Sequence, residues 1–236
     1  MNSLTLDGMS VGIEQGGPSR QARLTVEPTG ELLLRLGSGV TEQEANTFLS
    51  QKRNWIYRQL IALDDGNAKP VTKQLVNGEG FTYLGRNYRL HVSAGDTDTV
   101  SLIGGRLTLP EKAAINGSGP ILIKEWYSSR FTAWLAPRLK QWAAHYLVEP
   151  ARLDVIELGH KWGSHTLHGG IRVHWAAAQL PPRLIEYVAM HELAHLVEPN
   201  HSPRFWASLT RALPDAIERK EQLAAAGPKV WLGQVH

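Results

Sequence analysis

The spacing of apolar and polar residues changes character along the chain. In the first half, short runs of alternating apolar and polar residues are separated by turn residues, which is typical of strands. Runs at 22–26 and 31–36 predict a hairpin, and runs between 81 and 109 predict short antiparallel strands. Between these two groups, a capping box at 41–44 predicts a helix that continues to about residue 63.

Beyond residue 118 the pattern becomes mainly helical. Residues 121–147 predict two helices, or one helix kinked at Pro137. Alternation at 153–162 and 171–175, around a polar loop at 163–170, predicts a hairpin, and Pro181-Pro182 marks the start of another helix. Loop-forming residues at 116–120 predict a boundary, and no internal repeat is evident. We therefore expect a flexible tail (1–20), a β-rich region with one helix (21–118) and a catalytic domain (119–236).

The helix expected after Pro182 carries the motif His191-Glu192-Leu193-Ala194-His195. Histidines four residues apart share one helix face, so both imidazoles can bind one metal ion. Glu192 points about 100° away around the axis, close enough to hold a metal-activated water without binding the metal. This is the HExxH arrangement of zinc hydrolases, in which the glutamate is the general base.

His201 is the expected third ligand. Its side chain can return to the ion only if the helix ends after His195, and Pro199-Asn200 supplies that end. The spacing matches the metzincin pattern except that Glu198 replaces its glycine, so no metzincin assignment follows. Chance placement of these residues is on the order of one in a thousand. Apolar neighbours predict a buried helix, in which two merely solvated histidines are disfavoured.

Composition narrows the other possibilities. The chain has 236 residues, 42% of them hydrophobic, which is enough to form a core. Because it has no cysteine, disulfides and cysteine ligands are excluded. No signal peptide or membrane-spanning run is present, which favours a cytoplasmic protein. Although the net charge is +3, its lysines and arginines are scattered, so nucleic-acid binding is not indicated.

Several segments resemble the YgjP-like metallopeptidase family. They are 161–164, 170–175, 187–195 and 200–206, with further similarity at Trp55-Ile56 and 81–88. The resemblance implies a gluzincin-like α+β zinc domain behind a β-rich N-terminal region, with peptidase activity. It places the family motif on His191, Glu192, His195 and His201. The family usually has arginine, cysteine and asparagine where this chain has Lys161, His165 and His174, so roles tied to those three residues do not carry over.

Other polar residues are candidates for substrate binding. His160, His165, His168 and His174 surround the expected hairpin, where they would form a second metal site, position substrate or simply belong to an exposed loop. Lys161, Arg204 and His174 are candidates for stabilising an oxyanion or binding substrate, and ordinary ion pairs are the alternative for the two cations. Glu198 is expected to be a solvated last-turn residue and not a ligand.

The sequence thus predicts a zinc metallopeptidase acting on a peptide or protein. We expect the strand 171–175 to pair with an extended substrate. Two alternatives stay open. One is hydrolysis of a non-peptide substrate such as a nucleotide phosphoanhydride. The other is a metal-stabilised binding module acting on nucleic-acid-associated proteins, which would have no need of Glu192.

Overall fold

The computed structural model describes residues 3–16, 21–26, 31–64, 71–95, 98–159 and 161–235. The chain forms two compact units, residues 1–69 and 70–236, each with its own hydrophobic core. The fold is α+β, as the sequence predicts. The division lies at 69/70 and not near residue 118, because strands before residue 118 share one core with the helices that follow.

The first unit contains a four-stranded sheet. Its strand order is β1 (Ser3–Leu6), β2 (Met9–Gln15), β4 (Leu32–Leu36) and β3 (Ala22–Val26). The predicted hairpin is confirmed by the antiparallel pairing of β3 with β4. The prediction of a flexible tail over 1–20 is contradicted for residues 3–15, because Leu4, Leu6 and Val11 alternate with polar residues and bury one face of β1 and β2. Residues 17–20 lie outside the described residues.

Helix α1 (Glu42–Asp64) packs on this sheet. The predicted capping box is confirmed: the Thr41 amide donates to the Glu44 carboxylate at 2.8 Å, and the Glu44 amide donates to the Thr41 hydroxyl at 3.2 Å. Ala45, Leu49 and Ile56 face the core and are at most 1% exposed. Their spacing places them on one side of the helix.

The second unit begins with a sheet of the same topology as the first. Its strand order is β5 (Gly80–Tyr83), β6 (Arg86–Ser93), β8 (Arg106–Pro110) and β7 (Ser101–Ile103). In both sheets the outer pairs are antiparallel and the central pair is parallel. The strands were therefore predicted correctly, but the expectation of purely antiparallel pairing was wrong. The two sheets share this topology without obvious sequence similarity.

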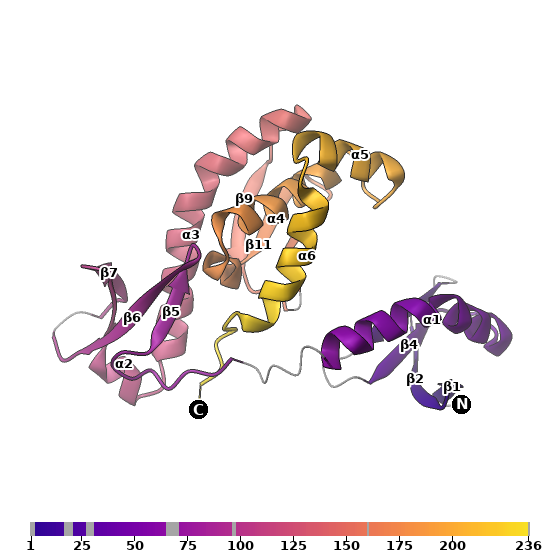
Figure 1. Cartoon of the computed structure of the whole chain (residues 1–236), viewed down its shortest axis with the longest axis horizontal. Helices are drawn as coiled ribbons and strands as arrows, with labels where there is room; N and C mark the ends of the chain where they lie inside the picture. The colour runs from indigo at the N-terminus through magenta and orange to yellow at the C-terminus, as the bar shows by residue number, and fades with distance from the viewer. Residues whose placement is uncertain are drawn as a thin grey trace. The chain divides into compact units, whose positions relative to one another are not determined.

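A short helix, α2 (Glu111–Ile115), leads into α3 (Gly119–Ala143), which contains Pro137 and is one continuous helix, ending at the 3-10 turn Ala144–Tyr146. Figure 1 shows α3 as the long pink helix beside the strands of this unit. Its buried aromatic residues, Tyr127 and Phe131, are fully enclosed. The helix thus joins the first sheet of the unit and the sheet described next in one core.

The third sheet has β11 (Gly170–His174) at its centre. It pairs in parallel with β9 (Arg152–Ile156) and antiparallel with β10 (Gly163–His165). The predicted hairpin between 153–162 and 171–175 is therefore wrong, because the true hairpin partner of β11 lies inside the expected polar loop. The predicted substrate strand, 171–175, is also wrong, since a strand paired on both sides has no free backbone edge.

The remaining helices complete the second unit. A 3-10 segment (Trp175–Gln179) precedes α4 (Pro182–His195), and α5 (Pro203–Ala212), α6 (Ala216–Ala226) and a 3-10 turn (Gly227–Lys229) follow. The predicted helix start at Pro182 is confirmed. The Ser202 hydroxyl caps α5 by accepting from the Phe205 amide at 3.3 Å. Of the helices in the described ranges, none combines the length and apolarity needed to cross a membrane.

Candidate metal centre

Helix α4 and the loop after it bring three histidines together. The helix ends at His195, as the position of His201 requires. The Nε2 atoms of His191, His195 and His201 lie 3.2 Å (His191–His195), 3.1 Å (His195–His201) and 2.9 Å (His191–His201) apart. Among the described residues these side chains form the one group of three or more candidate ligands close enough to bind a metal ion.

The hydrogen-bonding capacity of the three rings fits a cation. The Nδ1 atom of His195 lies 3.1 Å from the Glu198 carbonyl oxygen, to which it donates, so its Nε2 carries a lone pair. No placement of hydrogens on the Nε2 atoms of His191 and His201 satisfies all three contacts. If both carry a hydrogen, their N–H groups face each other, and if either lacks one, its lone pair faces the lone pair of His195. A metal ion accepts all three lone pairs. Tetrahedral zinc with bonds of about 2.05 Å would separate its ligands by about 3.3 Å, close to the observed spacing.

Aromatic side chains from α5 hold the imidazoles in place. Phe205 is fully buried and contacts all three rings, with ring centroids 4.5 Å from His195, 4.8 Å from His201 and 5.0 Å from His191. Trp206 stacks on His201. Sequence reasoning included these two residues in the family resemblance but gave them no role. The sequence signal that could have identified them is their position directly after the capped start of α5.

Burial keeps the three histidines neutral near pH 7. It lowers the pKa of His191 to about 3, with a further contribution from the neighbouring His195 and His201. The pKa values of His195 and His201 are also lowered, mainly by burial. A neutral imidazole presents the lone pair that a metal ion needs. The metal-free site is thus already in the protonation state that binds a cation.

Glu192 is 7% exposed and lies on the side of α4 that faces β10. Burial raises the pKa of its carboxyl group to about 7, and the positive charge of Lys161 opposes this shift. A carboxyl group with a pKa near the working pH is suited to accept and return protons. Its side chain lies beside Gly163 of β10, and the Nδ1 atom of His165 lies 3.5 Å from its Oε2 atom.

The histidines near the predicted hairpin separate in the structure. His165 stacks on His195, with ring centroids 4.8 Å apart, whereas His168 is exposed in the β10–β11 turn. His160 lies outside the described residues. The second metal site considered for these histidines is not formed by the described side chains. Of the members of this group that the structure describes, His165 is the one that lies beside the three-histidine cluster.

His174 has a structural role that argues against the predicted substrate contact. It is 2% exposed. Its Nε2 atom lies 2.6 Å from Glu157, and its Nδ1 atom accepts from the Ala176 amide at 3.0 Å. Glu157 also accepts from Trp175 at 2.8 Å. With both ring nitrogens occupied, His174 fixes the connection between β11 and the segment that leads to α4.

Of the other predicted polar residues, Lys161 and Arg204 are at the surface and Glu198 is half-buried. Lys161 is exposed but close enough to Glu192 to affect its pKa. Arg204 is exposed in the first turn of α5. Glu198 contributes its backbone carbonyl to His195. Substrate or oxyanion roles for Lys161 and Arg204 stay predictions.

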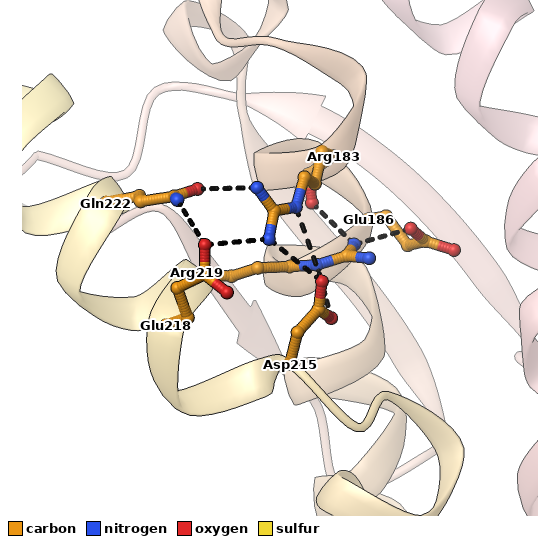
Figure 2. Close-up of polar contacts among 6 residues, drawn as sticks. All are labelled: Arg183, Glu186, Asp215, Glu218, Arg219 and Gln222. Carbon is orange, nitrogen blue, oxygen red and sulfur yellow. Dashed lines mark hydrogen bonds and ion pairs between the residues drawn. The ribbon is translucent and has the colours of Figure 1, made fainter.

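An ion-pair network fixes the N-terminal half of α4 to α6 (Figure 2). Arg219 of α6 is 11% exposed at its side chain and donates to the Arg183 carbonyl at 2.9 Å and to Glu186 at 2.5 Å. It also pairs with Asp215 at 2.7 Å, and Asp215 in turn pairs with Arg183 at 3.0 Å. Glu218 and Gln222 complete the cluster around Arg183. Because α4 carries the metal motif, this network helps to fix the helix on which the site is built.

Comparison with known families agrees with the geometry. The family model for the YgjP-like metallopeptidase domain matches residues 20–226. The chain belongs to this family. Membership indicates a metal-dependent peptidase, and the three-histidine cluster is consistent with a bound metal ion. Searches of the curated proteins and of the solved structures gave no match.

Proposed function

We propose that this YgjP-like protein is a zinc peptidase that hydrolyses peptide bonds by means of a metal-activated water, with Glu192 as general base. The observation that carries the proposal is the convergence of three neutral imidazoles on one point, next to a buried glutamate of raised pKa. A site built only to stabilise the fold would have no need of that glutamate, and burying its carboxylate is costly.

His191, His195 and His201 would hold the ion. The set consists of nitrogen ligands, and three such ligands with an open fourth position are typical of catalytic zinc. Zinc bound there would supply Lewis-acid chemistry, polarising the scissile carbonyl and making water acidic. The chain's contribution is to fix the ligands through Phe205 and to bury Glu192 and His195, while His201 is exposed and leaves the site open to substrate.

Glu192 would move the proton. In hydrolysis, the water oxygen attacks the carbonyl carbon while Glu192 accepts the water proton. The C–N bond then breaks, and Glu192 returns the proton to the leaving amine. The raised pKa suits both steps, because the carboxylate must take up the proton and the carboxylic acid must release it near neutral pH.

A peptide substrate has a suitable backbone partner in β10. Among the described strands of its sheet, β10 pairs on one side only, and its other edge is available for β-addition by an extended peptide. This strand packs against α4, so the added peptide would lie beside the metal centre. β10 therefore replaces 171–175 as the proposed substrate strand.

The proposal is tested by an unbiased substrate screen. Zinc-loaded wild type and Glu192→Gln are incubated with a pool of peptides and, separately, with a pool of nucleotides. We expect wild type to cleave peptides and Glu192→Gln to be inactive although it retains zinc. Cleavage of nucleotides alone would favour phosphoanhydride hydrolysis. Peptide cleavage by Glu192→Gln at the wild-type rate would refute its role as general base.

A further inference from the structure

The edge strand β10 presents two of its three residues to Glu192. Side chains alternate along a strand, so Gly163 and His165 share one face and Ser164 points to the other. The shared face packs on α4. Both residues lie against the Glu192 carboxyl group, from two different directions.

The first contact is at Gly163, where the absence of a side chain leaves room for Glu192. A Cβ atom at this position would lie 2.7 Å from Cγ and 2.8 Å from Oε1 of Glu192. These distances are shorter than nonbonded carbon and oxygen atoms tolerate, so the Glu192 side chain occupies space that only glycine leaves free. The backbone of β10 is fixed there by its ladder with β11, in which Gly163 is paired with Val173.

His165 forms the second contact. Its Nδ1 atom lies 3.5 Å from Oε2 of Glu192, which is long for a hydrogen bond, and hydrogen bonds in active sites often shorten only when substrate binds. The ring itself is held by stacking on His195, at an interplanar angle of 30°. Phe205 stacks on His195 as well, also at 30°, and two rings stacked this closely cannot share one face. His195 therefore lies between His165 and Phe205.

We propose that Gly163 and His165 are positioning residues that together orient the Glu192 carboxylate toward the attacking water. Gly163 admits the side chain, and His165 attracts Oε2 through its Nδ1 hydrogen. The expected effect of these residues on turnover rests on the proposed function. Their expected effect on the position of the Glu192 carboxylate does not. His165 is not a metal ligand in this account, because the three Nε2 atoms already form the ligand set.

Four variants of the full chain test this role. His165→Leu keeps an apolar group against His195 but removes the nitrogen. His165→Asn restores a side-chain N–H at the position of Nδ1. Gly163→Ala places a methyl group against Glu192. His168→Ala, at an exposed position of the β10–β11 turn, is the matched control.

Three readouts are taken for each variant: the crystallographic position of the Glu192 carboxylate in the metal-free protein, the zinc content, and kcat and KM on an internally quenched peptide mixture. We expect His165→Leu and Gly163→Ala to displace the carboxylate, to keep zinc, and to lower kcat by about 10-fold and about 100-fold with little change in KM. His165→Asn should restore the carboxylate position and most of kcat. His168→Ala should resemble wild type.

Two results would overturn the proposal. One is an unmoved carboxylate in both His165→Leu and Gly163→Ala. The other is loss of zinc from His165→Leu, which would make His165 a ligand. If wild type cleaves no peptide, the proposed function fails, while the carboxylate position in the crystals still decides whether Gly163 and His165 orient Glu192.

Discussion

Replacing Glu192 with glutamine should stabilise the metal-free protein at alkaline pH while it abolishes turnover. In wild type the carboxyl group is 7% exposed and has a pKa of about 7, against an ordinary value of 4.5. Above pH 7 the folded protein must therefore hold a buried negative charge that the unfolded chain exposes to water. Glutamine has almost the same shape and carries no charge.

The size of the effect follows from the two pKa values. Because the folded pKa is raised, the stability that Glu192 contributes is fully present below pH 4.5 and is lost as the pH rises through 7. At 1.36 kcal/mol per unit of pKa, the loss is about 3 kcal/mol at pH 8. The buried glutamine amide lacks some of its hydrogen bonds, and this costs about 1–2 kcal/mol of the stability gained by removing the charge. The variant should therefore be more stable than wild type by about 1–2 kcal/mol at pH 8, and this advantage should shrink by about 2 kcal/mol at pH 5.5.

Urea unfolding of the chelator-treated protein measures this difference. Tryptophan fluorescence is a suitable probe, because all eight tryptophans except Trp55 lie in the unit of residues 70–236 that contains the site. Glu221→Gln, at an exposed position of α6, is the control and should show no difference that depends on pH. The reasoning fails if the stability difference between Glu192→Gln and wild type is the same at pH 5.5 and pH 8, or if the variant is the less stable protein at pH 8.

Three further predictions follow from other contacts. Arg219→Ala leaves the carboxylates of Glu186 and Asp215 without their buried cation and should destabilise the second unit by about 2–3 kcal/mol in urea unfolding. Arg211→Ala, at an exposed position, should have little effect. Equal effects of the two substitutions would show that the ion-pair network does not stabilise this unit. Lys161→Met removes a positive charge that lowers the pKa of Glu192, so the acidic limb of the kcat/KM profile should move to higher pH, and an unchanged limb would contradict this. Thr41→Ala removes the capping box of α1 and should cost about 1 kcal/mol, seen as faster amide exchange near the start of the helix; unchanged exchange would show that the box contributes nothing.

The metal centre was predictable because most of its geometry is local. Two histidines four residues apart on a helix face one ion whatever the rest of the fold does. The end of α4 and the start of α5 also have local signals, in Pro199-Asn200 and Ser202-Pro203. These signals explain why the sequence could predict that His191, His195 and His201 lie together, and their role as ligands stays a prediction.

Strand pairing was not predictable to the same extent. Alternation identifies a strand but does not identify its partner, because the partner is chosen by contacts distant in sequence. β9 and β11 pair in parallel through a connection that includes β10, and β10 has only three residues in a segment that looks like a polar loop. The same limitation hid the topology shared by the two four-stranded sheets.

The environment of Glu192 also depends on this tertiary pairing. Gly163 reads as a loop glycine in the sequence, yet its missing side chain makes room for Glu192. His165 was considered as one of several loop histidines, and only the position of β10 beside α4 distinguishes it from His168. His174 was a candidate for binding substrate, whereas the structure buries it and pairs it with Glu157.

The zinc content of the purified full chain tests the central claim most directly. Elemental analysis is applied to wild type, His195→Ala and Glu192→Gln after removal of loosely bound metal, and circular dichroism verifies that each protein is folded. The account predicts about one zinc per chain in wild type and in Glu192→Gln, because three imidazoles form the ligand set and Glu192 is not part of it. It predicts loss of zinc from His195→Ala. Undiminished zinc in a folded His195→Ala would contradict it.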